Sequence, residues 1–403
     1  MRGARIFGLV TSDGRQTMDV EHAGPTRPAL LQECSGACGD LGTFLPHVTA
    51  ALTVAGLAPA GVLLGFGVTL IGSGLFYGVP IAVQPMKAVS AVLLTGGLGV
   101  GEVAAAGMML GAILLALGGT GLIGRIAGLI PKSVTAGLQL GLGLSMAALG
   151  LGLVLRTPWL GGAALALLLL LGRLPRLPAV PLMVVAACAA GWLAGEVALP
   201  SGIGCHWQLP ALVVPSWAEL WQGFGRAALP QLPLTLTNAV IVTAALCREL
   251  YPARAPRASE RNLALTSGLA NRLLSPRGAM PMCHGAGGLQ AQHRFGARTG
   301  LAPLLLGLAL LVLALGFADG AARLFAVIPI GAVGALLLVA GADLALSRRL
   351  LDARPSCWPA IGITAAATLL ANPAAGLVAG WATELVRSGV RSAIRPDRRI
   401  TPR

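Results

Sequence analysis

Apolar stretches of about 20 residues, the length that crosses a bilayer, recur from Leu41 almost to Arg387 with only short polar breaks between them. Because lipid offers no partners to free backbone N–H and C=O groups, a chain that crosses it repeatedly is expected to do so as helices. The charged fraction agrees, since 11% of the 403 residues are charged, whereas soluble domains carry about 25%. We therefore expect an all-α polytopic membrane protein.

The net charge of +14 is distributed as in a membrane protein and not as in a nucleic-acid binder. Lys87 and Lys132 are the only lysines, and most arginines lie in short loops or at the termini. Such an excess of positive charge is typical of cytoplasmic loops. We expect a multi-pass protein of the inner (plasma) membrane with both termini in the cytoplasm, and no nucleic-acid partner.

The seven cysteines are scattered through mostly apolar sequence. Cys34 and Cys38 have a loose metal-binding spacing, but no second pair completes a zinc site. We expect no disulfide framework, no metal and no cofactor.

Breakers and charges divide the chain into about fourteen hydrophobic segments. The first seven are expected at about 40–57, 59–78, 80–97, 99–118, 131–154, 160–172 and 180–199. The second seven are expected at about 229–247, 259–275, 281–292, 301–318, 324–342, 356–371 and 374–388. Residues 200–228 hold three tryptophans and are expected to be an interfacial connection, because tryptophan favours the headgroup level. Residues 1–38 and 389–403 are expected to be cytoplasmic tails.

Three landmarks of the first half recur in the second half at nearly one spacing. The pairs, 198 to 201 residues apart, are Pro80 and Pro281, Pro131 and Pro329, and Asp40 and Asn238. This agreement predicts two homologous transmembrane repeats, 39–199 and 229–388, of seven segments each. Since seven is odd, the second repeat enters the membrane in the opposite sense, which gives the inverted repeat of many secondary carriers.

The third segment contains Gln84, Pro85 and Lys87. Pro80 and Pro85 each remove a backbone donor and disfavour a continuous helix through this stretch. A helix that begins near Gln84 would direct its free N–H groups and positive dipole end into the protein. A lysine at membrane depth usually faces a polar cavity or a partner; the alternative is that Lys87 extends to the membrane surface. We expect Gln84 and Lys87 to bind an anion.

The tenth segment contains His284 and three glycines, Gly285, Gly287 and Gly288. Glycine lets a ligand approach the backbone, and a glycine-rich helix start offers N–H groups to an anion. His284 adds a donor that can carry a proton near neutral pH. The alternative is tight glycine packing between helices with a histidine in the core. The correspondence with the third segment favours a binding site.

The two broken segments are expected to meet near the membrane midplane with their positive ends converging, as two half-helices. Asn238, of the eighth segment, is expected to join them in the substrate site. No Asp or Glu lies inside segments three, eight or ten, so the site favours an anion over a cation or a nucleobase.

A dianion that enters against an inside-negative potential needs a coupled cation or trapping inside the cell. The candidate proton carriers are His284 and, at the start of the first segment, Asp40. Glu102, Asp343 and Glu384 lie near predicted helix ends and are weaker candidates.

Four stretches resemble signatures of the bacterial and plant molybdate transporter family, a branch of the sulfate permease superfamily. They are Val83–Lys87, Cys283–Leu289, Gly39–Pro46 and Leu234–Asn238, and the resemblance runs from about Gly39 to Glu384. It implies seven plus seven helices, divided into a substrate-bearing core and a gate domain. It also implies molybdate uptake, with sulfate or tungstate as weaker substrates. The chain ends soon after its last segment, so we expect it to lack the cytoplasmic regulatory domain of sulfate permeases.

The expected partners are a molybdate- or sulfate-like oxyanion, the lipid bilayer and, in a homodimer, a second copy of the chain. Three other functions stay open: a carrier of sulfate or another oxyanion, a passive anion channel, and an intramembrane enzyme using Cys283, His284 and His293. The enzyme is disfavoured, because no HExxH motif accompanies these residues and Cys283 lacks a visible base.

Overall fold

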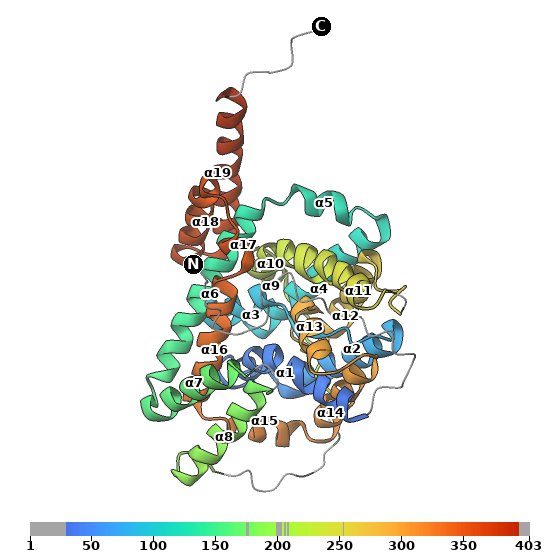
Figure 1. The fold of residues 1–403 in the computed structure, drawn as a ribbon, viewed down its shortest axis with the longest axis vertical. Helices are drawn as coiled ribbons and strands as arrows, with labels where there is room; N and C mark the ends of the chain where they lie inside the picture. Colours follow the sequence, from blue (N-terminus) through green and yellow to red (C-terminus); the bar gives the residue numbers. More distant parts are fainter. Residues whose placement is uncertain are drawn as a thin grey trace.

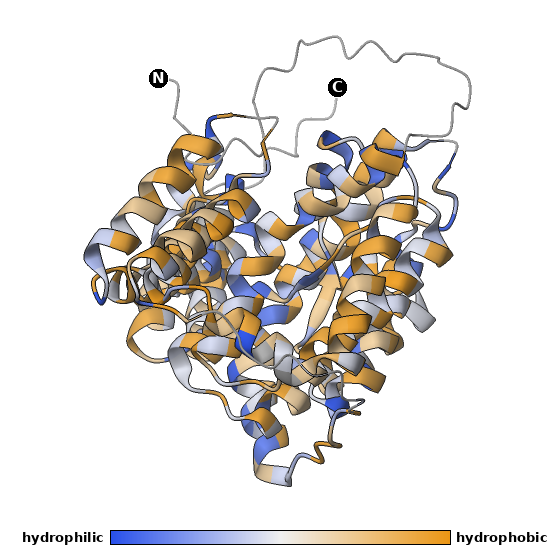
Figure 2. Cartoon of the chain, turned by 90° about the horizontal axis from the view of Figure 1, so that it is seen from below, coloured by the Kyte–Doolittle hydropathy of each residue, from blue (hydrophilic) through white to orange (hydrophobic). Residues whose placement is uncertain are grey.

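The computed structural model describes residues 30–394, apart from 175–176, 199–203, 205–206, 208 and 253. Its helices form two bundles that lie side by side (Figure 1). Seen along a perpendicular direction, hydrophobic residues cover most of both bundles and several hydrophilic stretches lie between them (Figure 2). Of the two expected tails, residues 1–29 and 395–403 lie outside the described residues, while α1 begins at Leu30 and α19 extends to Ile394.

Bundle one holds the elements that contribute the two broken segments. Its elements are α1 (Leu30–Thr53), α2 (Pro59–Tyr77), β1 (Val83–Pro85), α3 (Lys87–Gly96), α4 (Val100–Thr120), α5 (Ile123–Leu129), α9 (Trp217–Gly223), η1 (Phe224–Ala228), α10 (Leu229–Leu234), η2 (Thr235–Val242), α11 (Thr243–Leu250), α12 (Glu260–Leu274), η3 (Ser275–Arg277), β2 (Met282–His284), α13 (Ala286–Arg294), α14 (Leu301–Gly316) and α15 (Ala318–Ala326).

Bundle two consists of helices from the end of each half of the chain. Its elements are α6 (Lys132–Val154), α7 (Pro158–Gly172), α8 (Ala179–Leu193), α16 (Ile330–Ala345), α17 (Arg348–Leu351), η4 (Pro355–Cys357), α18 (Trp358–Leu370) and α19 (Pro373–Ile394). The two bundles touch mainly where α3 packs on α6 and where α1 packs on α16 and α8.

The long helices pack in pairs that cross at glycines. In bundle one α2 packs along α14 and α4 along α12, and in bundle two α6 packs along α16. At these crossings a glycine Cα faces the backbone of a glycine in the partner helix, as in Gly67 and Gly307, Gly111 and Gly268, and Gly143 and Gly341. Small residues let helices approach closely where lipid supplies no hydrophobic driving force.

Five helical runs in the described part of the chain are long and apolar enough to cross a membrane. They are Pro59–Tyr77, Val100–Thr120, Lys132–Val154, Trp217–Leu250 and Ile330–Leu351. The expectation of a polytopic helical membrane protein is therefore confirmed.

One detail of the all-α expectation is wrong, because β1 and β2 form a two-stranded antiparallel sheet. Gln84 precedes Pro85, and Met280 precedes Pro281. A residue before proline is pushed into extended conformation. The broken segments therefore reach their helices as short strands and not as a bent helix.

The expected connection 200–228 is also shorter than predicted. Ser216 and Glu219 form a capping box, with the Ser216 N–H donating to Glu219 Oε2 (2.7 Å) and the Glu219 N–H to Ser216 Oγ (3.3 Å). This cap starts a helical run that continues from Trp217 to Leu250. Pro230 and Pro233 remove backbone donors within the run, and π-helical turns η1 and η2 flank the prolines.

Candidate functional site

The pairing of β1 with β2 brings the two broken segments together. Val83 pairs with His284, Gln84 with Cys283, and Pro85 with Met282. Each strand leads directly into a short helix, α3 from Lys87 and α13 from Ala286, and because the strands are antiparallel the two helices start at opposite ends of the small sheet. A helix N-terminus carries a partial positive charge. Two such ends therefore flank the sheet.

Asp40 of α1 holds both broken segments with one buried carboxylate. Its Oδ1 accepts from Gln84 Nε2 (2.8 Å) and its Oδ2 from Gln292 Nε2 (3.2 Å), while Thr43 Oγ1 lies 3.3 Å from Oδ1. Asp40 is 0% exposed. The site thus contains a carboxylate that inspection of segments three, eight and ten did not provide. The Gln84 side-chain amide donates to Asp40 Oδ1 and to Thr43 Oγ1. These hydrogen bonds hold β1 against α1.

The N-terminus of α3 is less open than the sequence suggested. The side chain of Gln231, from α10, accepts from the Ala88 N–H (2.8 Å) and from the Val89 N–H (3.4 Å). The Ser90 N–H bonds to Met86 O within the first turn. Among the described hydrogen bonds, only the Lys87 N–H of this turn has no acceptor, so α3 offers an anion one backbone donor and the lysine side chain.

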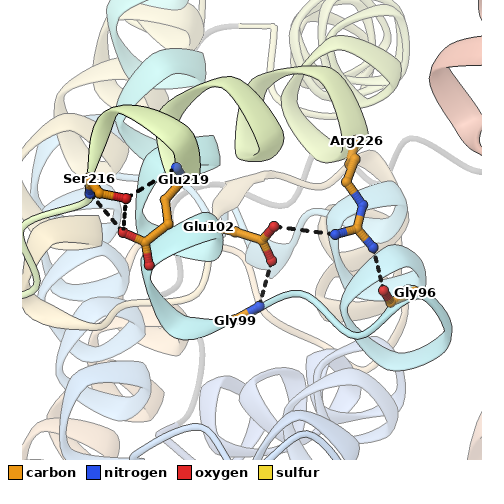
Figure 3. A network of polar contacts seen from close by, with 6 residues as sticks. All are labelled: Gly96, Gly99, Glu102, Ser216, Glu219 and Arg226. Carbon is orange, nitrogen blue, oxygen red and sulfur yellow. Dashed lines mark hydrogen bonds and ion pairs between the residues drawn. The ribbon is translucent and has the colours of Figure 1, made fainter.

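The C-terminus of α3 is fixed by a second residue of the Trp217–Leu250 run. Arg226 donates to Gly96 O and forms an ion pair with Glu102 Oε1 (3.2 Å), whose Oε2 accepts from the Gly99 N–H (2.7 Å) (Figure 3). A cation at a helix C-terminus complements the helix dipole. Since Gln231 caps the other end, the short helix that carries Lys87 is held at both termini.

The three glycines of the second motif have different surroundings. A Cβ at Gly288 would collide with Asp40 Oδ1 and Gln84 Nε2, and one at Gly285 with Gln84 Oε1. A Cβ at Gly287 would meet nothing within 4 Å. Gly285 and Gly288 therefore allow close packing of α13 on the Gln84 side chain, and Gly287 is the member of the motif that faces open space.

A cavity of about 120 Å³ lies between the bundles, next to this junction. A single water needs only about 10–15 Å³ measured in this way, so the space suffices for an anion with four oxygens. Its polar and charged lining residues are Cys38, Thr43, His47, Lys87, Arg294 and Asp343, and α7 and α8 supply an apolar wall. Lys87 is exposed into this space although Met86 and Ala88 on either side are buried.

His284 and Asn238 lie away from the cavity. The His284 ring is 1% exposed, with Nε2 2.8 Å from Thr266 Oγ1 and Nδ1 3.4 Å from Ala82 O. Asn238 Oδ1 accepts from Arg349 Nη2 (2.8 Å), which joins η2 of bundle one to α17 of bundle two. Neither side chain is among those that line the cavity.

The cavity also contains residues that sequence reasoning did not assign to the site. Thr43 belongs to the Gly39–Pro46 stretch and His47 directly follows it, and His47 Nδ1 lies 2.9 Å from Ser90 Oγ of α3. Asp343 lines the cavity from α16. The other acidic candidates have partners elsewhere, since Glu102 pairs with Arg226 and Glu384 with Arg387.

The chain is similar in sequence to known molybdate transporters. A family model described as "Molybdate transporter of MFS superfamily" matches residues 32–146 and 223–344. Molybdate transporter 1 of Arabidopsis thaliana is 33% identical over 87% of this chain and 86% of its own, and molybdate transporter 2 of that plant is 32% identical. Molybdate transporter 1 of Chlamydomonas reinhardtii is 31% identical over 78% of this chain and 83% of its own.

Two solved anion transporters are among the structures that share the fold. The transmembrane domain of the cyanobacterial bicarbonate transporter BicA superposes with a TM-score of 0.65 at 19% identity, over 87% of this chain and 96% of that one. SLC26A9 superposes with a TM-score of 0.68 at 14% identity, over 90% of this chain and 66% of that one. The fold is thus that of BicA and SLC26A9, and by its sequence the chain belongs to the molybdate transporter family.

Proposed function

We propose that this protein is a secondary transporter that imports a tetrahedral oxyanion, most specifically molybdate, by alternating access. The observation that carries the proposal is the position of Lys87. It is the first residue of a half-helix and extends into a cavity between two bundles. Membership of the molybdate transporter family supports the choice of substrate.

The substrate would sit where α3 and α13 begin. Lys87 supplies a full positive charge, and the glycine-rich start of α13, at Gly287, supplies N–H groups that have no described acceptor. Gln84, Gly285, Gly288 and His284 hold this backbone in place through the contacts described above. Such a set offers donors from several directions, which suits the oxygens of a tetrahedral dianion.

The packing of the helices supports an inverted repeat. Adding about 200 residues relates α2 to α12, α4 to α14 and α6 to α16. The pair α2–α14 then corresponds to the pair α12–α4, and both pairs pack extensively. In the pairs α6–α16 and β1–β2, the same shift exchanges the two members, so each pair is its own counterpart. A two-fold axis of this kind, with the site on it, is the geometry in which one bundle can rock against the other.

Arginine asymmetry supports an inner-membrane location with both termini in the cytoplasm. The proposal also includes a homodimer as the assembly in the membrane.

The deciding experiment is uptake of radioactive molybdate at trace concentration into proteoliposomes, with excess sulfate or tungstate as competitor. Saturable uptake that resists sulfate supports a molybdate carrier. Strong inhibition by sulfate favours the general oxyanion carrier instead. Flux that never accumulates against a gradient would indicate a passive channel, and absence of flux for all three anions would refute the proposal.

A further inference from the structure

Lys87 and Asp343 line the same cavity from opposite bundles. Lys87 begins α3 in bundle one, and Asp343 lies near the end of α16 in bundle two. Both side chains are exposed and line the cavity. Among the described residues neither makes a hydrogen bond or an ion pair within 4 Å, so the two charges share the cavity without direct contact.

The described lining contains few other groups that can carry charge. Arg294 of α13 is a second cation, and His47 and Cys38 of α1 are the remaining titratable groups. The described lining residues from α7 and α8 are all apolar or glycine. Asp343 is the one acidic side chain among the described lining residues. A dianion bound at Lys87 would face the like charge of the Asp343 carboxylate, and a proton on that carboxylate would remove the repulsion.

We propose that Asp343 is the counter-charge of the empty cavity and takes up one proton when a dianion binds at Lys87, so that anion and proton cross together. This inference rests on the proposed function. The proton comes from water on the side of binding and returns to water on the side of release, and the anion forms no covalent bond. The net charge moved per cycle falls from two to one, which reduces the work against an inside-negative potential.

Asp343 is better placed for this role than the two other candidate carriers. Both carboxylate oxygens of Asp40 already accept hydrogen bonds, and both ring nitrogens of His284 have partners. Neither residue lines the cavity. Among the described residues, only Asp343 combines a titratable side chain, access to the cavity and a place on the bundle that faces Lys87.

The test measures anion binding and uptake with the full-length protein in lipid, between about pH 5 and pH 8. The variants are Asp343→Asn, His284→Gln and, as a matched control, Asp352→Asn, whose carboxylate is exposed just beyond α17 and outside the cavity lining. The probes are molybdate and sulfate. Sulfate stays a dianion throughout this range, so an acid-stimulated signal for both anions belongs to the protein.

We expect the parent and Asp352→Asn to bind both anions more tightly as pH falls. Asp343→Asn should bind with little pH dependence. At alkaline pH it should bind about tenfold more tightly than the parent, because it lacks the like charge that disfavours a second anion nearby. Uptake by this variant should no longer acidify the vesicle interior.

If anion binding by Asp343→Asn depends on pH as it does in the parent, the inference is overturned. It is also overturned if, of the three variants, only His284→Gln loses the pH dependence of binding. In both cases uptake by the parent would leave the proposed function standing. A parent that binds and transports neither anion would refute both.

Discussion

Removing the Lys87 side chain separates its role in binding from any role in folding. Lys87 makes no described hydrogen bond or ion pair with the protein, and its side chain is exposed into the cavity. Substitution of such a residue usually changes stability by no more than about 0.5 kcal/mol. A hydrogen bond between a charged group and the anion is worth about 1.5–3 kcal/mol. At about 1.4 kcal/mol per tenfold step, Lys87→Ala should lower Vmax/KM for molybdate by about 10- to 100-fold.

The chain supplies a matched control, because its one other lysine also begins a helix. Lys132 is the first residue of α6, is exposed, and does not line the cavity. Uptake into proteoliposomes at matched protein density should therefore be unchanged in Lys132→Ala, and the two variants should melt at nearly the parent's temperature. Normal transport by Lys87→Ala, or an equal loss in both variants, would mean that the lysine at α3 does not bind the anion.

Three further predictions concern the support of the site and the topology. Gln231→Leu leaves the buried Ala88 and Val89 N–H groups without their acceptor and should lower the free energy of unfolding by about 1–3 kcal/mol, measured as a lower melting temperature. The control is Gln139→Leu, at a buried glutamine whose Oε1 has no described partner, which should lower it much less. Equal losses in the two variants would refute the capping role of Gln231. Gly288→Ala should destabilise the protein, because its Cβ meets Asp40 and Gln84, whereas Gly287→Ala should fold normally; similar thermal stability of the two would contradict the packing described. Reporter fusions after Pro256, and after Arg399 beyond the described residues, should both read as cytoplasmic, and a periplasmic signal at either would break the fourteen-segment topology.

The parts of the fold that sequence predicted best are those that a single strong physical constraint determines. The thickness of the bilayer fixes the length of an apolar helix, so α2, α4 and α6 fall within a residue or two of their predicted bounds. Proline placed the breaks in the two polar segments correctly. The start of the Trp217–Leu250 run was missed, although Ser216 and Glu219 carry the spacing of a capping box, because its tryptophans suggested the membrane surface.

The site was predictable only as far as its residues follow from local chemistry. Lys87 stood out because a charge at membrane depth needs a reason. The role of Gln231 did not, because its amide caps a helix 143 residues earlier in the chain, and sequence separation hides such a contact. Asp343 was set aside because it lies near the end of its helix. Its importance depends on which residue faces it across the junction of two bundles, and that is a property of the packing of α16 against α1 and not of the α16 sequence.

The same packing suggests why the carrier holds its charges on separate bodies. Asp40 and Lys87 both belong to bundle one, and the carboxylate is buried beneath the glycine-rich start of α13, where its hydrogen bonds are satisfied in any position of bundle two. Asp343 belongs to bundle two, so under the proposed alternating access its distance from Lys87 would change as the bundles move. A carboxylate fixed in bundle one can only shape the site, whereas a carboxylate on the opposite bundle would make the charge of the empty cavity depend on the conformation. The charge that an anion meets would thereby be linked to the proposed movement that carries the anion across.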